Sequence, residues 1–287
     1  MILIIGSNGQ LGRQMQKTLA MRGQAFVAYD YPQIDIAQPN DILDLIAAVR
    51  PSIVINCAAY TNVDKAEANE ETAYSINALG PKHLALACAD TKIELVHIST
   101  DYVFSGEPPI QHGKPRPYIE EDSCDPATAY GRTKLAGERL VKENCDKWYI
   151  LRTAWLYGDG HNFVRTMLRL AETNDTISVV SDQFGSPTST VDLAESVCTL
   201  LGTGAYGLYH ATCEGQCSWR DFAAKIFDLA GRPVQVLPVT SQEYNRAHPG
   251  AAPRPGWSVL ENAALKQAGK NVFRDWEESL KEYLREL

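Results

Sequence analysis

The first residues of the chain, 1–5, form an apolar run that no polar residue interrupts. Such a run predicts a buried central strand of a parallel sheet. An amphipathic stretch follows, in which Leu11, Met15 and Leu19 recur at helical spacing before Arg22. The pattern therefore predicts a strand that passes directly into a helix.

Apolar runs and amphipathic stretches continue to alternate through the first half of the chain. We expect strands at 25–29, 52–57, 93–98 and 148–153, and helices at 41–49, 71–89 and 129–142. This alternation predicts an α/β fold with a doubly wound parallel sheet of the Rossmann type and right-handed crossovers. A stretch rich in Pro, Gly and acidic residues, 105–126, is expected to be an irregular loop near a site.

The second half of the chain is less regular. We expect helices at 163–172, 191–201, 218–230, 261–268 and 275–285, short strands at 177–180, 207–210 and 234–238, and a loop at 246–256. We therefore predict a dinucleotide-binding domain at 1–155 and a smaller, mainly helical substrate lobe at 156–287. Some segments of the lobe are expected to return to the first domain.

Composition and charge exclude several classes of partner. The net charge of −8 argues against nucleic acid and anionic membranes, both of which attract basic patches. No apolar run reaches membrane-spanning length, and because the first predicted strand begins at Met1 we expect no signal peptide. Seven scattered cysteines are typical of reduced thiols in a cytosol, so we predict a cytoplasmic protein. Cys213 and Cys217 are the only close pair and lack two further ligands at matching spacing, so we predict no metal site.

The turn between the first strand and helix carries glycines at the spacing G-x-x-G-x-x-G. Gly6 permits the turn, Gly9 allows close approach of a pyrophosphate to backbone N–H groups, and Gly12 allows tight packing of helix on strand. Asp30 ends the second predicted strand, close to the position of an acid that binds the adenosine ribose. The alternative is a structural turn with a surface aspartate. The context favours a dinucleotide site.

A second motif, Tyr130-x-x-x-Lys134, lies at the start of a predicted helix. The spacing of four places both side chains on one helical face, where an ammonium group lowers the pKa of a phenol. Thr100 ends a strand and offers a hydroxyl that could polarise a carbonyl, although a strand-end threonine also commonly caps a turn. Together the three residues are suited to protonating an alkoxide as hydride arrives.

With these motifs the chain resembles the extended short-chain dehydrogenase/reductase superfamily and, within it, the family of dTDP-4-dehydrorhamnose reductases. The resemblance covers essentially the whole chain. Besides the glycine motif, it rests on stretches 56–67, 99–104, 130–138, 152–157, 182–188 and 254–260.

The resemblance implies hydride transfer from NADH or NADPH to C4 of dTDP-4-dehydro-L-rhamnose, which yields dTDP-L-rhamnose for carbohydrate biosynthesis. It implies that Tyr130 donates the proton, that Lys134 lowers the pKa of Tyr130 and holds the nicotinamide ribose, and that Thr100 polarises the carbonyl. The residues implied to bind the dinucleotide are Gly6, Gly9, Gln10, Leu11, Gly12, Asp30, Asp35, Ile36, Ala58, Ala59, Tyr60, Tyr130 and Lys134. Those implied to bind the dTDP-sugar are Thr100, Asp101, Trp155, Asn162, Phe163 and Arg254.

Two positions bear on assembly and on cofactor choice. Some members of the family dimerise through a magnesium ion held by glutamates, and this chain has Gln14 at one such position, so we predict a monomer and leave a weak homodimer open. Asp30 favours NADH because it would repel a 2′-phosphate, whereas Arg13 could bind that phosphate.

Two other functions stay open at this point. One is a different nucleotide-sugar reductase or epimerase on the same scaffold, and an epimerase would retain tightly bound NAD⁺. The other is a non-catalytic dinucleotide-binding subunit, similar to the regulatory subunit of methionine adenosyltransferase. The presence of Thr100, Tyr130 and Lys134 argues against the second alternative.

Overall fold

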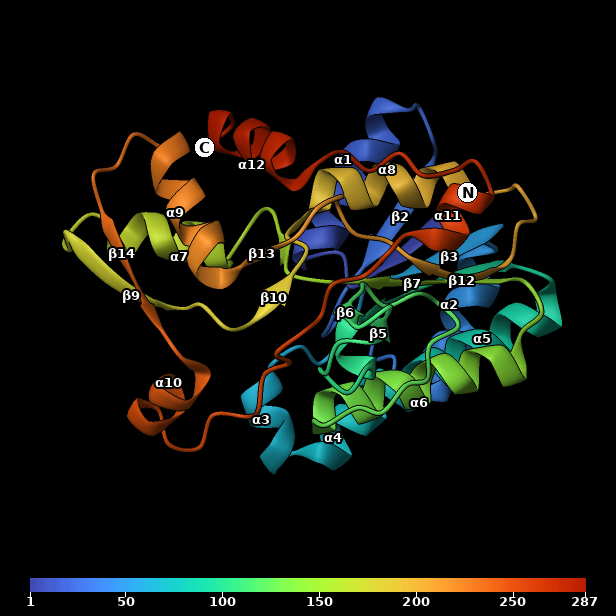
Figure 1. Ribbon diagram of the computed structural model, residues 1–287. Coiled ribbons are helices and arrows are strands. Elements are labelled where there is room, and N and C mark those ends of the chain that lie inside the picture. The colour runs from blue at the N-terminus through green and yellow to red at the C-terminus, as the bar shows by residue number, and fades with distance from the viewer.

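A single sheet of six parallel strands organises the protein in a computed structural model that describes residues 1–287 (Figure 1). Its strands run, from one edge to the other, β2 (Phe26–Tyr29), β1 (Ile2–Ile5), β3 (Ile53–Asn56), β4 (Glu94–Thr100), β7 (Trp148–Thr153) and β12 (Gly207–His210). This order reverses direction after β1, as a doubly wound sheet requires, and it confirms the predicted fold class.

Alternate residues of each strand enter two separate cores. Ile2 and Ile4 pack with Leu11 of α1 (Gln10–Met21) and Leu193 of α8 (Thr190–Leu200) on one face. Leu3 and Ile5 pack on the other face, which is covered by α2 (Pro39–Val49), α5 (Gly80–Thr91) and α6 (Ala129–Asn144). Because both faces are buried, the strands carry continuous apolar runs rather than polar alternation.

Several local features differ from the predicted elements. The single helix expected at 71–89 is instead α4 (Glu70–Tyr74), a π-helical turn (Ser75–Leu79) and α5 in direct succession. The loop expected at 105–126 contains a short hairpin of β5 (Ile110–Gln111) and β6 (Lys114–Pro115), and follows a 3₁₀ turn (Asp101–Val103). Two short helices, α3 (Val63–Ala68) and α10 (Ser241–Ala247), were not predicted, because each is too short to show a periodic apolar face.

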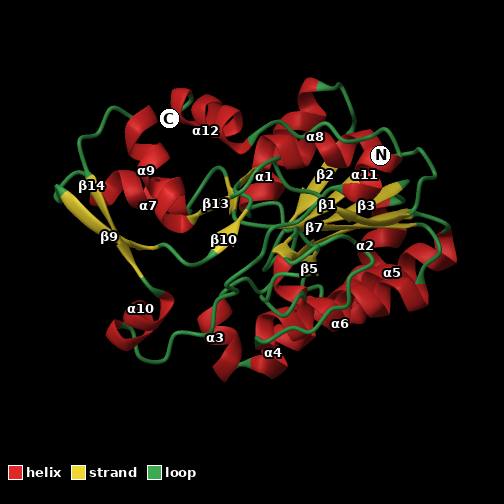
Figure 2. Cartoon of the chain, viewed as in Figure 1, coloured by secondary structure: helices red, strands yellow, loops and turns green.

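The second half of the chain contributes to two parts of the molecule. β12 completes the central sheet beside β7, α8 packs on α1, and α11 (Ala263–Gln267) packs on β12. The other elements lie beyond the carboxyl edge of the sheet, on the left of Figure 2. They are the helices α7 (Phe163–Leu170), α9 (Trp219–Leu229), α12 (Trp276–Arg285) and α10, and three pairs of short strands. These pairs are β8 (Leu156–Tyr157) with β11 (Thr188–Ser189), β9 (Thr176–Val180) with β14 (Gln235–Val239), and β10 (Phe184–Gly185) with β13 (Cys217–Ser218).

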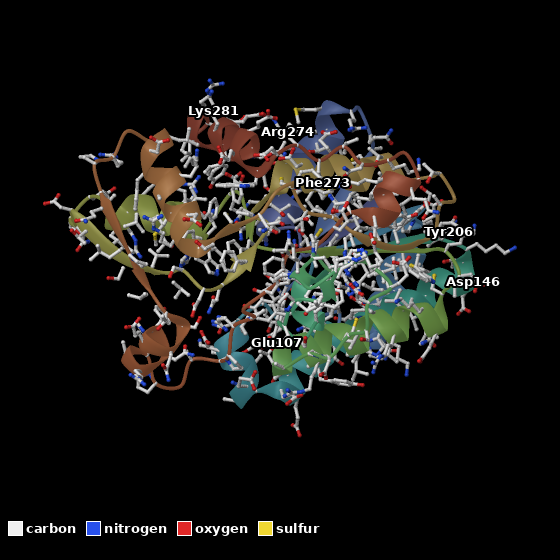
Figure 3. The ribbon with its side chains drawn as sticks, viewed as in Figure 1. Glu107, Asp146, Tyr206, Phe273, Arg274 and Lys281 are labelled. Carbon is white, nitrogen blue, oxygen red and sulfur yellow. The ribbon has the colours of Figure 1, made fainter.

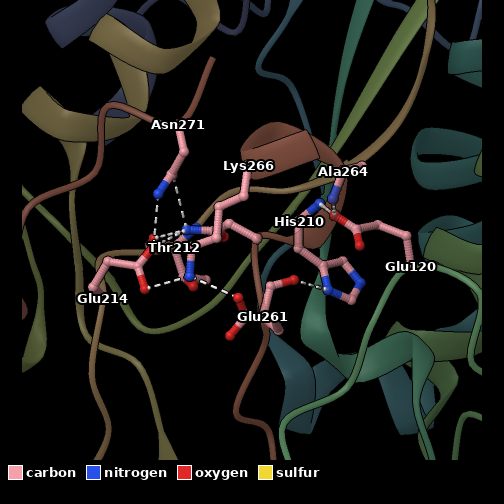
Figure 4. A network of polar contacts seen from close by, with 9 residues as sticks. Glu120, His210, Thr212, Glu214, Glu261, Ala264, Lys266 and Asn271 are labelled. Atoms are coloured by element: carbon pink, nitrogen blue, oxygen red, sulfur yellow. Dashed lines mark hydrogen bonds and ion pairs between the residues drawn. The ribbon is translucent and has the colours of Figure 1, made fainter. Parts of the chain in front are cut away.

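A polar network fixes the last strand of the sheet to the returning C-terminal segment (Figure 4). One carboxylate oxygen of Glu120 accepts hydrogen bonds from the backbone N–H groups of His210, at 2.8 Å, and Ala264, at 3.1 Å. Asn262 exchanges two hydrogen bonds with the backbone of Thr212, at 2.8 and 3.1 Å. These bonds satisfy backbone groups that the edge strand and the short helix α11 would otherwise leave unpaired.

None of the helices combines the length and the apolar composition that a bilayer-spanning segment needs.

Candidate active site

A cavity of about 660 Å³ opens at the carboxyl ends of β1, β3, β4 and β7. In a doubly wound sheet this edge is the expected place for a ligand, and the volume is that of a typical small-molecule site. Fourteen of the residues predicted from the sequence line it together. They are Gly6, Gly9, Gln10, Leu11, Asp30, Asp35, Ile36, Ala58, Ala59, Thr100, Asp101, Tyr130, Lys134 and Trp155.

The glycine turn brings the backbone close to the cavity without side chains in between. Gly6 has a φ of +78°, and a Cβ there would lie 2.4 Å from the backbone nitrogen of Ala58. A Cβ on Gly12 would lie 2.1 Å from the carbonyl oxygen of Gly6, so Gly12 lies beneath the turn rather than on the cavity wall. No side chain caps the N-terminus of α1, which leaves its first N–H groups available for an anion.

Two buried polar atoms at the same end of the cavity have no partner, namely Oε1 of Gln10 and Nε of Arg13. An uncapped helix N-terminus, a turn without side chains and unpaired polar atoms fit the pyrophosphate and ribose groups of a dinucleotide. The residues present therefore suit NAD(H) or NADP(H) at this end.

Asp30 holds the glycine turn as well as facing the cavity. Its two carboxylate oxygens accept hydrogen bonds from the backbone N–H groups of Asn8, at 2.6 Å, and Tyr31, at 2.8 Å. The guanidinium of Arg13 donates to the backbone oxygen of Asp159 at 2.9 Å, so it is directed toward the segment that follows β8. Both residues predicted to govern a 2′-phosphate thus line one end of the cavity, each with a partner inside the protein.

The segment that follows β3 is held by an amide in the π-helical turn. Oδ1 of Asn77 accepts from the N–H of Tyr60 at 2.8 Å, and Nδ2 donates to the carbonyl oxygen of Tyr60 at 3.1 Å and to Oγ1 of Thr133 at 3.2 Å. These hydrogen bonds fix the backbone of Tyr60. Its side chain does not line the cavity, although the resemblance implied that it binds the dinucleotide. It packs against a small apolar cluster of Ala66, Ala73 and Ala129, as Tyr130 also does.

Lys134 and Tyr130 lie on one face of α6, as their spacing predicts. Nζ of Lys134 is buried and donates to the carbonyl oxygen of Ile98 at 2.6 Å. Burial lowers the pKa of Lys134 to about 8, and the negative charge of Glu138 opposes that change. Burial also raises the pKa of Tyr130 to about 12, which the neighbouring Thr100 hydroxyl partly opposes. Desolvation therefore outweighs the other effects on the pKa of Tyr130 among the residues of this chain by themselves, and the role of Lys134 in lowering that pKa stays a prediction.

Thr100 and Asp101 form a bonded pair at the end of β4. The hydroxyl of Thr100 donates to Oδ1 of Asp101 at 2.9 Å, and it also accepts from the N–H of Tyr102 at 3.3 Å. Thr100 is thus both a turn cap and a cavity residue. Oδ2 of Asp101 is buried without a partner, and burial raises the pKa of this carboxyl to about 6 against the opposing hydroxyls of Thr100 and Ser258. An unpaired acceptor in the cavity is available to a hydroxyl group of a ligand.

Trp155 reaches the cavity from a strained backbone position, with a φ of +48°. Its ring stacks on Trp219 with centroids 3.5 Å apart and planes 7° from parallel. The indole therefore joins the end of β7 to helix α9 and presents an apolar wall, as the prediction of a substrate contact requires.

Three residues predicted to contact substrate do not line the cavity. Asn162 caps α7 by accepting a hydrogen bond from the N–H of Arg165 at 3.0 Å, and it donates one to the carbonyl oxygen of Gly158 at 2.6 Å. Both ends of its side-chain amide are therefore hydrogen-bonded within the protein. Phe163 packs its ring on Trp219 and Phe222. Arg254 pairs with both carboxylate oxygens of Asp64 at 2.9 Å. In each case a tertiary partner that the sequence does not reveal holds the side chain, and the role in substrate binding stays a prediction.

Several cavity residues were missed. Thr61, Val63, Ser99 and Tyr102 lie inside stretches that carried the family resemblance, so the signal was present although no role was assigned. Cys57, Thr153, Ala154 and Leu156 lie in such stretches as well. Ile5, Tyr31, Ile34, Ile76 and Ile98 lie outside them and were assigned no role.

No group of three or more His, Cys, Asp or Glu side chains is arranged to hold a metal ion. Gln14 donates its amide to Oγ1 of Thr18 at 3.2 Å. Cys213 and Cys217 are buried thiols, and Sγ of Cys213 donates to Oγ of Ser279 at 3.5 Å.

Comparison with known proteins gives this site a context. The family model described as "RmlD substrate binding domain" matches residues 1–287. A dTDP-4-dehydrorhamnose reductase from Streptomyces griseus is 42% identical over 98% of this chain and 91% of its own length. The crystal structure of a dTDP-4-dehydrorhamnose reductase from Clostridium acetobutylicum is 48% identical, has a TM-score of 0.93 and aligns over 99% of this chain and 98% of that one. The corresponding enzyme of Bacillus anthracis, solved in complex with NADP, is 41% identical with a TM-score of 0.93 over 100% of this chain and 99% of that one.

Proposed function

The chain belongs to the RmlD substrate-binding-domain family, and from this premise we propose that it reduces dTDP-4-dehydro-L-rhamnose to dTDP-L-rhamnose with NADPH or NADH. It is an NAD(P)H-dependent oxidoreductase of nucleotide-sugar biosynthesis. The observation that carries this conclusion is the meeting of the glycine turn with Thr100, Tyr130 and Lys134 on one cavity. A dinucleotide cradle and an acid for the reacting oxygen are the two requirements of a carbonyl reductase.

The reduced nicotinamide, when bound, supplies the hydride that reduces the C4 carbonyl. Tyr130 donates its phenolic proton to the 4-oxygen. Its raised pKa keeps the phenol protonated at neutral pH, and an alkoxide is a far stronger base than the phenolate left behind, so the proton moves downhill. The ammonium of Lys134 stabilises that phenolate. Thr100 turns its hydroxyl from Asp101 toward the carbonyl oxygen and polarises it.

The same proposal assigns the remaining cavity residues. The glycine turn, Gln10 and Leu11 hold the pyrophosphate and ribose, with Asp30, Asp35 and Ile36 near the adenosine and Ala58 and Ala59 along the dinucleotide. The free oxygen of Asp101 accepts a sugar hydroxyl, and Trp155 forms an apolar wall against the sugar ring.

Cofactor choice turns on Asp30 and Arg13. The Bacillus anthracis relative binds NADP. In this chain a 2′-phosphate would approach a carboxylate that already holds the glycine turn, while Arg13 offers an unpaired Nε at the same end. We propose use of both cofactors, with Arg13 offsetting the repulsion from Asp30.

The experiment that tests this function is turnover of enzymatically prepared dTDP-4-dehydro-L-rhamnose, followed as loss of reduced nicotinamide absorbance with NADPH and NADH in parallel. Oxidation that depends on the sugar supports the proposal, and the ratio of the two rates tests the roles of Asp30 and Arg13. Intact cofactor binding without oxidation would move the assignment to another 4-keto sugar or to a dinucleotide-binding subunit. Tightly retained NAD⁺ in the purified protein would favour an epimerase.

Two further statements belong to the proposal. The chain works as a monomer, since Gln14 is a neutral amide already bonded to Thr18. The chain has a dinucleotide-binding domain at 1–155, which supplies every residue that lines the cavity except Leu156, and a substrate lobe at 156–287. Analytical ultracentrifugation at assay concentration tests the first statement.

A further inference from the structure

The three residues assigned to proton transfer lie on two separate elements. Thr100 ends strand β4, whereas Tyr130 and Lys134 lie in the first turns of helix α6. The connection between them contains the irregular hairpin loop, so the backbone alone does not fix their distance. Side-chain contacts between α6 and β4 must therefore set the geometry of the trio.

Two side chains of α6, one helical turn apart, reach consecutive residues of β4. Lys134 donates to the backbone oxygen of Ile98 at 2.6 Å, and Oε1 of Glu138 accepts from the hydroxyl of Ser99 at 2.6 Å. The next residue of the strand is Thr100. The contact of Glu138 with Ser99 thus links the helix that carries Tyr130 to the residue directly before Thr100.

Glu138 also binds the neighbouring strand. Its two carboxylate oxygens accept from Nε of Arg152 at 2.9 Å and from Nη2 at 2.8 Å. Both side chains are almost completely buried, with exposures of 0% and 3%. Arg152 is the register partner of Ser99, and the next pair in register is Thr100 with Thr153. A single carboxylate therefore joins α6 to the ends of both strands that form the catalytic wall.

A buried ion pair is a costly way to stabilise a fold, because desolvation cancels much of the attraction and an apolar pair of similar volume often serves as well. A forked carboxylate–guanidinium pair does, however, impose one geometry. The charge of Glu138 also favours the ammonium form of Lys134. Glu138 therefore acts on the trio of Thr100, Tyr130 and Lys134 both through the geometry that it imposes and through its charge.

We propose that Glu138 is a positioning residue for the reduction, which fixes α6 against β4 and β7 and thereby sets the distance from Tyr130 to Thr100. This inference rests on the proposed function, since the reaction is its readout. It assigns no chemical step to Glu138, which does not line the cavity.

The test compares kcat, KM for the sugar, Kd for NADPH and thermal stability in three variants. Ser99→Ala removes one hydrogen bond, Glu138→Gln removes the charge, and Glu138→Gln with Arg152→Met removes the ion pair without leaving a buried lone guanidinium. We expect kcat to fall several-fold in the first and by about 10- to 100-fold in the other two, the scale of a misplaced reacting group, with Kd for NADPH unchanged.

The matched control is Asp192→Asn. Asp192 forms a comparable forked pair with Arg274, at 2.8 and 3.2 Å, on the segment that leads into α12, and Figure 3 places Arg274 well away from α6. Neither residue lines the cavity, so this variant should lose stability and keep kcat.

Wild-type kcat in Ser99→Ala and in the double variant would overturn the inference, as would a loss of kcat and cofactor affinity that follows thermal stability in the same way as Asp192→Asn. If the double variant does not fold, the kcat of Ser99→Ala alone tests the inference. An inactive wild type would count against the proposed function and not against the role of Glu138, which is then measured on whichever 4-keto sugar the wild type reduces.

Discussion

The two ends of the cavity are built by different means. At the cofactor end, backbone groups form the surface, through the turn of Gly6 and Gly9 and the uncapped N-terminus of α1. At the substrate end, side chains from distant parts of the chain meet, as in the stack of Trp155 on Trp219. A local motif can specify the first kind of surface, whereas only the complete tertiary structure specifies the second.

The difference also predicts how each end responds to mutation. A substitution at the cofactor end should lower cofactor affinity sharply, because an added Cβ enters the binding surface that the backbone forms. A change at the end built from side chains should first alter stability, since each side chain there also holds the fold together. The following experiments separate these responses, and they begin with the residue that belongs to both ends.

Tyr130→Phe is expected to have the largest effect. It removes the proton donor while keeping the ring and its edge contact with Tyr102. We expect kcat to fall by about 10²- to 10⁴-fold, the usual contribution of a positioned acid, with unchanged affinity for NADPH. Stopped-flow single-turnover assays and fluorescence titration measure the two quantities. Substantial retained turnover would remove Tyr130 from the mechanism.

Gly12→Ala and Gly9→Ala separate the contribution of the glycine turn to folding from its contribution to cofactor binding. A Cβ at Gly12 would lie 2.1 Å from backbone oxygen, so that variant should lose both stability and NADPH binding. A Cβ at Gly9 meets its nearest atom at 3.4 Å, so the fold should accept it while the pyrophosphate is displaced. Melting temperature and NADPH affinity are the measurements. Equal losses in both variants would contradict the separation.

Asp101 makes stability depend on pH. Its pKa is about 6 in the folded protein, against 3.8 for an unperturbed carboxyl, so the folded state binds more protons between these values. Stability is therefore highest below pH 3.8 as far as this group is concerned, and it falls as the pH rises to about 6, by about 3 kcal/mol in total. Urea unfolding at pH 4, 5, 6 and 7 should show this loss in the wild type and not in Asp101→Asn. Parallel curves for the two proteins would be the contrary result.

Asn162→Ala tests the substrate end. The residue caps α7 and bonds to Gly158, so we expect a loss of about 1–2 kcal/mol in stability with little change in KM for the sugar. Thermal unfolding and steady-state kinetics at a temperature well below the transition separate the two effects. A large rise in KM without destabilisation would restore the role in substrate binding that the family resemblance implies.

Arg254→Ala should have the smallest effect on the fold. Its pair with Asp64 is partly exposed, at 31% and 49%, so we expect a change within about 1 kcal/mol. Asp64→Ala is the matched control, since it frees Arg254 instead of removing it. A rise in KM for the dTDP-sugar in Arg254→Ala alone would show that the guanidinium leaves Asp64 for the nucleotide.

Those parts of the fold that follow from periodic pattern were predictable. The strands and helices of the first half, the glycine turn and the placement of Tyr130 with Lys134 all follow from local spacing. Asn77 illustrates the limit, because its place in a π-helical turn depends on a contact with Tyr60 from another segment. The pKa of Tyr130 illustrates another, since the spacing shows the charged neighbour but not the burial that outweighs it.

The surroundings of the predicted substrate residues could not be foreseen for the same reason. Asn162 and Phe163 stand in a stretch typical of a binding site, and nothing in the sequence indicates that Gly158 and Trp219 already occupy them. Conversely, Tyr102 reaches the cavity from a short 3₁₀ turn and Thr61 from the irregular segment before α3, and periodicity predicts neither.

The sixth strand of the sheet has a consequence for synthesis of the protein on the ribosome. β12 is made after α7, β9 and α8, so the edge of β7 stays uncovered until about three quarters of the chain has emerged. An unpaired edge of a parallel sheet is slow to find its partner and prone to pair with other chains. The cofactor half therefore cannot finish folding before much of the substrate half exists, and truncation after 155 should leave a nascent sheet that aggregates rather than a small independent nucleotide-binding protein.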